Sequence, residues 1–192
     1  MSQLLTLEAA SRALDDAGYA AGGFDRDDAA VIVGMSTTAD LFHYYITRSS
    51  LPLAVGSPGA DVFDRLPAWT EESFPGLLLN VTAGRVANRL DLGGPNYAVD
   101  AACASSLAAV QAGVRELESG RSSLAIVAGV ELDQTPYAYL SFSRTRALSP
   151  TGTSRPFDRK ADGIVISEGI VALVLKRLDD AERDGDRIYS VL

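Results

Sequence analysis

The sequence is poor in the residues that bind metals and form disulfide bonds. Its 192 residues include a single cysteine, Cys103, and a single histidine, His43. One cysteine excludes an intrachain disulfide bond, and one cysteine with one histidine cannot make a cluster with the spacing of a metal site. We therefore expect no metal and no disulfide, and a free thiol is typical of the reducing cytoplasm.

The sequence also has fewer basic than acidic residues. The chain has 17 Lys and Arg against 25 Asp and Glu, which gives a formal net charge of −8. Because nucleic acids and anionic membranes attract basic surfaces, we expect neither as a partner. No run of about 18 apolar residues is available to span a membrane. The N-terminus lacks the basic segment of a secretory signal, so we expect a cytoplasmic protein.

Short apolar runs alternate with helical patterns along the chain. This alternation predicts an α/β fold with a mainly parallel sheet flanked by helices. We expect loops at 36–69, with at most one short helix, and at 136–159. The predicted strands buried on both faces are 29–35, 124–130 and 169–175. We also expect a strand at 96–102 and the start of one at 187–192. The predicted helices are 4–14, an interrupted 70–90, 103–119 and 179–184.

The segment VDAACASS at residues 99–106 carries the clearest chemical signal. It places Cys103 where a predicted strand meets a predicted helix, between small residues that let a substrate approach, as in a nucleophile elbow. The start of a helix offers unpaired N–H groups and positive partial charge, which favour the nucleophilic thiolate. The alternative is a buried cysteine that acts as a small hydrophobic residue. The strand and helix pattern by itself leaves both interpretations open.

The longer stretch at 74–106, FPGLLLNVTAGRVANRLDLGGPNYAVDAACASS, decides between them. With later motifs in the same order and spacing, it resembles the ketosynthase domains of fatty-acid and polyketide synthases over nearly the whole chain. DAACASS, LLLN and DAERDGDRIY are most similar to iterative polyketide synthases, such as those that make polyunsaturated fatty acids, enediynes or glycolipid chains. The later motifs are SFS at 141–143, ALS at 147–149, RPFD at 155–158, ADG at 161–163, EG at 168–169 and LVLKRL at 173–178.

The resemblance implies a thiolase-like fold, which has two similar βαβαβ halves. It implies that residues 1–192 are a partial β-ketoacyl synthase N-terminal domain, the first half only, without the family's first strand and its C-terminal half. Members of the family are homodimers in which the strand before the cysteine pairs with its twin. We therefore expect an isologous dimer of the intact domain through residues 96–102.

The resemblance also implies an activity and a partner. Cys103 would accept an acyl chain from the phosphopantetheine thiol of an acyl carrier protein, and a malonyl group on the carrier would then condense with it after decarboxylation. The chain itself would bind no cofactor. Ala102, beside the nucleophile, and Phe142, near the expected acyl channel, are substrate-binding candidates, although Phe142 also fits a core aromatic. The family uses two histidines; His43 matches neither, and we expect it on the surface or in a loop.

Two other functions compete with a condensing half-domain. The chain could be a catalytically inactive fragment or a dimer-forming scaffold of a thiolase-fold protein. It could also belong to another thiolase-fold acyltransferase, such as a stand-alone synthase of fatty-acid elongation. We expect the isolated 192 residues to be inactive in condensation.

Overall fold

The computed structural model describes residues 1–36, 40–56 and 59–192, and the chain divides into two compact units. The first unit comprises Met1–Thr38, Trp69–Val130 and Ile170–Leu192. The second comprises Ala39–Ala68 and Glu131–Gly169. Each unit is described by itself below.

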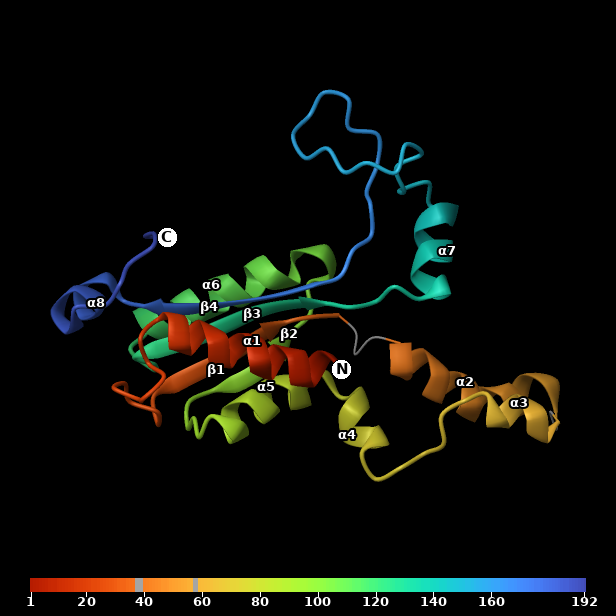
Figure 1. Cartoon of the computed structure of the whole chain (residues 1–192), viewed down its shortest axis with the longest axis horizontal. Coiled ribbons are helices and arrows are strands. Elements are labelled where there is room, and N and C mark those ends of the chain that lie inside the picture. Colours follow the sequence, from red (N-terminus) through yellow and green to blue (C-terminus); the bar gives the residue numbers. More distant parts are fainter. Residues whose placement is uncertain (37–39, 57–58) are drawn as a thin grey trace. The chain divides into compact units, whose positions relative to one another are not determined.

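A four-stranded sheet forms the centre of the first unit. Its strands are β1 (Ala29–Gly34), β2 (Asn96–Val99), β3 (Leu124–Glu131) and β4 (Gly169–Lys176), in the order β2-β1-β3-β4. β1 is parallel to both of its neighbours, with Ile32 opposite Tyr97 on β2 and opposite Val127 on β3. The arrow of β4 points the other way in Figure 1, so the sheet is mixed. The predicted α/β fold with a mainly parallel sheet is confirmed.

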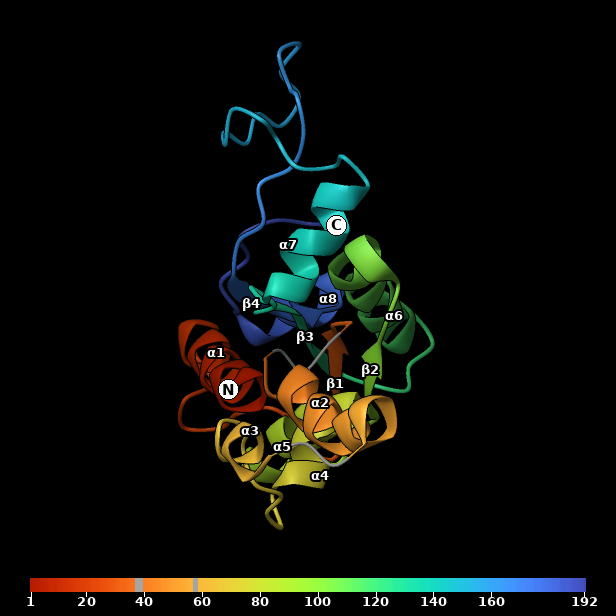
Figure 2. The same ribbon diagram turned by 90° about the vertical axis from the view of Figure 1, so that its right-hand side faces the viewer.

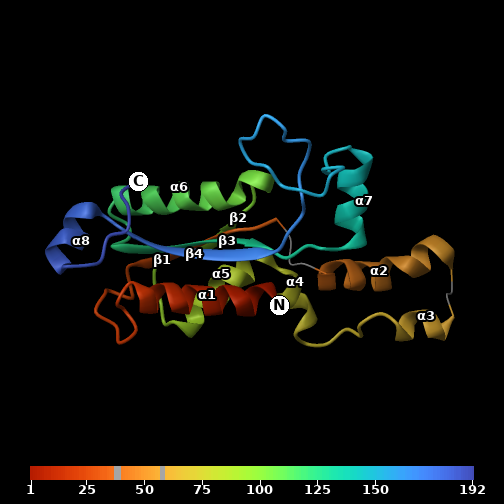
Figure 3. The ribbon, with the colours of Figure 1, turned by 45° about the horizontal axis from the view of Figure 1, so that its top comes forward.

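Helices cover both faces of this sheet. α1 (Ser2–Asp16) and α5 (Leu79–Arg89) lie on one face, and α6 (Ser105–Glu118) lies on the other (Figures 1 and 3). Because side chains alternate along a strand, Val31 and Val33 enter the core under α1 and α5 while Ile32 enters the core under α6. All six residues of β1 are buried, as predicted for a strand covered on both faces. Each such branched side chain contributes about 1.5–3 kcal/mol to folding.

The first unit also contains the shorter α-helices α4 (Ser73–Leu77) and α8 (Leu178–Asp184). Arg177, the residue before α8, donates from Nη1 to the carbonyl oxygens of Leu117 and Ser122, both at 2.9 Å. The Leu117 carbonyl lies in the last turn of α6, where a helix lacks internal donors, and Ser122 lies in the loop between α6 and β3. Arg177 therefore caps α6 and fixes the path of the chain into α8.

The described residues of the second unit form the helices α2 (Asp40–Val55), α3 (Ala60–Asp64) and α7 (Pro136–Arg144) (Figure 2). Arg48 on α2 donates from Nη1 to the carbonyl oxygens of Phe63 and Leu66, at 2.6 and 2.8 Å, and so holds the end of α3. Thr135 caps α7 by accepting the N–H of Ala138 at 3.3 Å, with Pro136 in the first turn.

The structure corrects four expectations. Most of 36–69 is helical in α2 and α3 (residues 37–39 and 57–58 of that range lie outside the described residues). Pro52 suggested a loop, but it lies inside α2, in the last turn, although a proline there cannot donate the usual hydrogen bond to the carbonyl four residues earlier. The loop expected at 136–159 begins with α7. β4 alternates between exposed and half-buried residues rather than being buried throughout.

The fourth correction concerns the end of the chain. Residues 187–192 form no strand. The side chains of Arg187 and Tyr189 instead bind the Asp16 carboxylate at the end of α1, with Arg187 Nη2 at 2.6 Å and Tyr189 Oη at 3.0 Å from its oxygens. These polar contacts hold the segment in an irregular path, which the apolar residues around them did not indicate.

Candidate functional site

Cys103 lies in a tight turn between β2 and α6. It is the middle residue of a single 3₁₀ turn, η1 (Ala102–Ala104), and α6 begins at Ser105. β2 ends at Val99, three residues earlier than predicted, which leaves room for this turn. The thiol is exposed, so a buried structural cysteine is excluded and the predicted strand–cysteine–helix arrangement is confirmed.

The residues around Cys103 hold the turn by side-chain hydrogen bonds. Asp100 Oδ1 accepts the N–H of Ala102 and the hydroxyl of Ser36, both at 2.9 Å. The Ala102 N–H, and after it the Ser36 hydroxyl, lower the pKa of Asp100 below its ordinary value. Ser105 Oγ accepts the N–H of Ala101 at 2.9 Å and donates to the carbonyl of Ala102 at 2.6 Å. The N–H of Cys103 is not among the groups that these contacts satisfy, so it can donate to a substrate.

Glycines near the ends of β1 and β3 pack closely against the first residues of α6. A Cβ added to Gly34, at the end of β1, would overlap the Ser105 carbonyl group and lie 2.8 Å from the Ser106 nitrogen. A Cβ added to Gly129 on β3 would lie 2.7 Å from the Cβ of Ser106. Only glycine allows such close approach. Sequence reasoning missed both residues, although a glycine near the end of each of two buried strands was a signal for them.

The other predicted site residues are distributed over both units. Ala102 adjoins Cys103 and is exposed. Phe142 lies on α7 in the second unit and is half-buried, so its role near an acyl channel stays a prediction. His43 is not in a loop: it lies on α2, partly buried, with Nε2 3.6 Å from Asp133 Oδ2 and its ring 5.1 Å from that of Tyr137. The expectation that His43 is neither of the two histidines that the family uses also stays a prediction.

A sequence model of the family described as "Beta-ketoacyl synthase, N-terminal domain" matches residues 1–181 of the chain. This chain belongs to the β-ketoacyl synthase family. It is 35% identical to one subunit of the polyunsaturated fatty acid synthase of Thraustochytrium, over 100% of the chain and 7% of the relative. It is 38% identical to one subunit of the phenolphthiocerol/phthiocerol polyketide synthase of Mycobacterium tuberculosis, over 99% of the chain and 9% of the relative. The chain thus spans less than a tenth of either relative.

Solved structures agree with this family and with the thiolase-like fold. A ketosynthase from module 6 of the bacillaene synthase of Bacillus subtilis superposes with a TM-score of 0.74 at 31% identity, over 98% of this chain and 29% of that one. A β-ketoacyl synthase from Burkholderia phymatum gives a TM-score of 0.77 at 28% identity, over 97% of this chain and 44% of that one. The arrangement of this chain is therefore that of a partial N-terminal half of the fold, as predicted.

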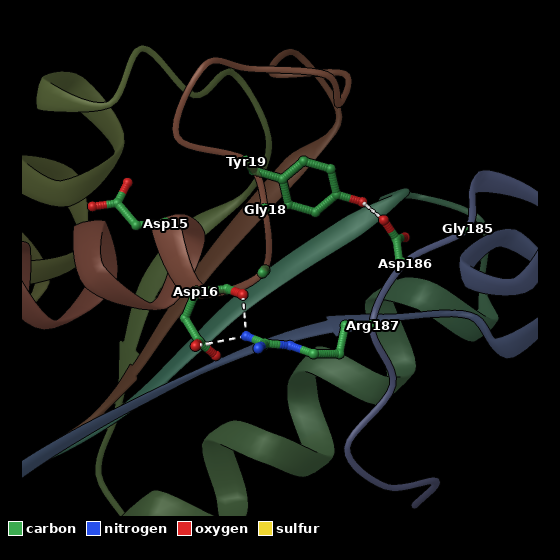
Figure 4. Close-up of a pocket in the computed structure, with 8 residues that line it drawn as sticks. Asp15, Asp16, Gly18, Tyr19, Gly185, Asp186 and Arg187 are labelled. Atoms are coloured by element: carbon green, nitrogen blue, oxygen red, sulfur yellow. Dashed lines mark hydrogen bonds and ion pairs between the residues drawn. The ribbon is translucent and has the colours of Figure 1, made fainter.

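A hollow in the first unit is lined by residues that are remote from Cys103 in the sequence. It has a volume of about 590 Å³ and lies between the end of α1 and the segment after α8 (Figure 4). Arg187 Nη2 binds Asp16 Oδ1 across it at 2.6 Å, and Tyr19 Oη donates to Asp186 Oδ1 at 2.8 Å. Hydrogen bonds from Tyr189, and next from Arg187, lower the pKa of Asp16. These paired groups connect the two ends of the chain, which is a structural role.

Neither a metal cluster nor a membrane span is found in the described part of the chain. Among residues 1–36, 40–56 and 59–192, no group of three or more His, Cys, Asp or Glu side chains is arranged to hold a metal ion. No helix in these same ranges has both the length and the apolar character needed to cross a bilayer.

Proposed function

We propose that this chain supplies the acyl-accepting nucleophile of a β-ketoacyl synthase, and that the nucleophile is Cys103. The observation that carries the proposal is the exposed thiol in η1, between a strand end and the first turn of α6. The turn has small side chains on both sides of the sulfur, which leaves space for a pantetheine arm. We propose a thioester on an acyl carrier protein as the acyl donor, and family membership supports this choice of partner.

The first half of the proposed reaction is acyl transfer to Cys103. The thiolate attacks the carbonyl carbon of the carrier thioester, a new C–S bond forms, and the bond to the pantetheine sulfur breaks. The departing pantetheine thiolate takes up a proton, so the carrier is released as the free thiol. The N–H of Cys103 would donate a hydrogen bond to the oxyanion that develops on the carbonyl oxygen.

The second half is condensation. A malonyl group on a second carrier loses CO₂, and the electron pair of the broken C–C bond attacks the acyl-Cys103 carbonyl. A C–C bond forms, the bond to Cys103 breaks, and the β-ketoacyl product is two carbons longer. The histidines that the family uses for this half match no residue of the chain. We therefore propose that residues 1–192 condense only together with further chain, and that alone they are inactive.

We also propose that the intact protein is an isologous homodimer and works in the cytoplasm. β2 is an edge strand of the sheet, so its outer side is open to pairing with a second copy. A dimer-forming scaffold without activity is the second candidate function, and the same open edge favours it. The two functions differ at Cys103, because a scaffold needs no reactive thiol.

The experiment is to incubate the full-length protein that contains this chain with an acyl thioester of pantetheine and to map the adduct by mass spectrometry. We expect one acyl group on Cys103, the sole cysteine of these 192 residues. Cys103→Ala should give no adduct, and Cys103→Ser should react at least about a hundredfold more slowly because a hydroxyl is a weaker nucleophile. Circular dichroism confirms that both variants fold. Acylation elsewhere, or acylation that survives Cys103→Ala, would exclude the proposed role and leave the scaffold.

A further inference from the structure

We propose that Asp100 is a positioning residue for Cys103, acting by holding Ala102 in a left-handed backbone conformation. The proposal rests on the function proposed above. It adds a residue that is hydrogen-bonded to Ala102 and Ser36 and that acts on the sulfur through the backbone of the turn.

The backbone of Ala102 is the first observation. Its φ is +49°, a region that residues with a Cβ rarely adopt and that favours glycine. A non-glycine residue keeps such a conformation only where its surroundings enforce it, and such residues cluster at functional sites. Because Ala102 directly precedes Cys103, its dihedral angles set the direction in which the Cys103 side chain leaves the turn.

The hydrogen bonds of Asp100 are the second observation, and they supply the enforcement. Oδ1 accepts the N–H of Ala102 at 2.9 Å, two residues along the chain, which closes a local turn that aspartate favours. The same oxygen accepts the Ser36 hydroxyl at 2.9 Å from just beyond β1. Asp100 thus ties the strained residue to the end of a strand whose six residues are all buried. Removing the carboxylate frees the Ala102 N–H and lets φ return to negative values.

Ser105 also holds the turn, but it does not bind the N–H of Ala102. Its hydroxyl accepts the N–H of Ala101 and donates to the carbonyl of Ala102, so the two peptide units are held by one side chain. The N–H of Ala102 is left to Asp100. The division of these contacts predicts that loss of Asp100 displaces the thiol while α6 stays folded.

A double-mutant cycle between Asp100→Ala and Ala102→Gly tests the proposal. The readouts, taken on the full-length protein, are the rate of acylation by a pantetheine thioester and the rate of alkylation of Cys103 by iodoacetamide. Asp100→Ala should lower both rates, acylation by about tenfold, because sub-ångström to ångström displacement of a nucleophile has effects of this size. In the Ala102→Gly background the same substitution should lower the rates less than about twofold, since glycine adopts positive φ without support.

Matched variants distinguish the positioning role of Asp100 from an effect of its charge and from a loss of folding. Asp100→Asn keeps an oxygen that accepts the Ala102 N–H, so it should retain most of the rate. Asp179→Ala removes another exposed carboxylate, in the first turn of α8, and should change neither rate. Asp100→Ala that reacts like the parent overturns the proposal, and so does a loss that neither Asp100→Asn nor Ala102→Gly restores. Alkylation by iodoacetamide requires no acyl transfer. A parent protein that is alkylated but not acylated would therefore refute the proposed function, and the alkylation rates of the variants would still decide the positioning role of Asp100.

Discussion

The turn at Cys103 combines three residues with three different tasks. Gly34 gives the turn space, Asp100 fixes its strained residue, and Ser105 satisfies two of its peptide groups. None of these groups bonds to the sulfur. The exposed thiol is therefore presented by packing and hydrogen bonding of the backbone around it, which matches the way in which functional sites are held on rigid elements.

Gly34→Ala should destabilise the fold and displace the Cys103 thiol. The added Cβ would overlap the Ser105 carbonyl group, which is backbone and cannot rotate away. We expect a loss of about 1–3 kcal/mol in the free energy of unfolding, as for other overpacked cores, measured by urea denaturation. Gly76→Ala is the matched control, since a Cβ there meets no atom within 4 Å. A Gly34→Ala protein as stable as its parent would show that the turn shifts freely.

At the scale of elements, polar side chains join segments that are far apart in the sequence. Lys176, at the end of β4, lies 2.6 Å from both Asp184 Oδ2 at the end of α8 and Asp186 Oδ2 beyond it. Burial alone disfavours the Lys176 ammonium, but hydrogen bonds to Asp184, Asp186 and Tyr19 raise its pKa overall. β4, α8 and the loop after α1 are thereby connected around one cation.

This cluster predicts an acid-dependent loss of stability. Hydrogen bonds from Arg183, and next from Lys176, lower the pKa of Asp184 from 3.8 to about 2. Since the folded-state pKa is depressed, the stabilisation is complete above the unfolded value and is lost as pH falls from about 4 to about 2. The urea midpoint of the parent should therefore fall more steeply over this range than that of Asp184→Asn. Parallel curves for the two proteins would contradict the contribution of Asp184.

At the scale of the whole molecule, large apolar side chains are exposed in both units. Leu107 on α6 is 74% exposed and Val171 on β4 is 64% exposed in the first unit, and Phe157 is fully exposed in the second. Where such side chains adjoin one another, the exposed apolar area favours association with other chains. The net charge of −8 opposes association but acts over only about 8 Å at physiological salt.

The isolated 192-residue chain should therefore self-associate. We expect its apparent mass in size-exclusion chromatography to rise with concentration, and we expect it to bind the dye ANS. Leu107→Gln and Val171→Thr should each weaken both signals, because each removes exposed apolar area. Leu53→Gln makes the same kind of change on α2 in the second unit, so that the two units can be compared. A monomer at all concentrations that binds no dye would contradict the prediction.

The accuracy of the sequence prediction followed the regularity of each segment. β1, β3 and α6 have clean apolar patterns, and their positions were predicted to within two residues. α2 was missed because its apolar residues and Pro52 follow no simple helical spacing. The strand predicted at 187–192 was wrong because Arg187 and Tyr189 bind Asp16, about 170 residues earlier in the chain, and a local pattern contains no information on such contacts.

The sequence by itself determined the family, the α/β order and the place of Cys103 between a strand and a helix, because these depend on local composition and spacing. Only the tertiary structure decided that the thiol is exposed, that Gly34 underlies its turn and that Asp100 joins Ala102 to Ser36. The physical reason is distance along the chain: Ser36 and Asp100 are 64 residues apart and meet only when β1 and β2 pair.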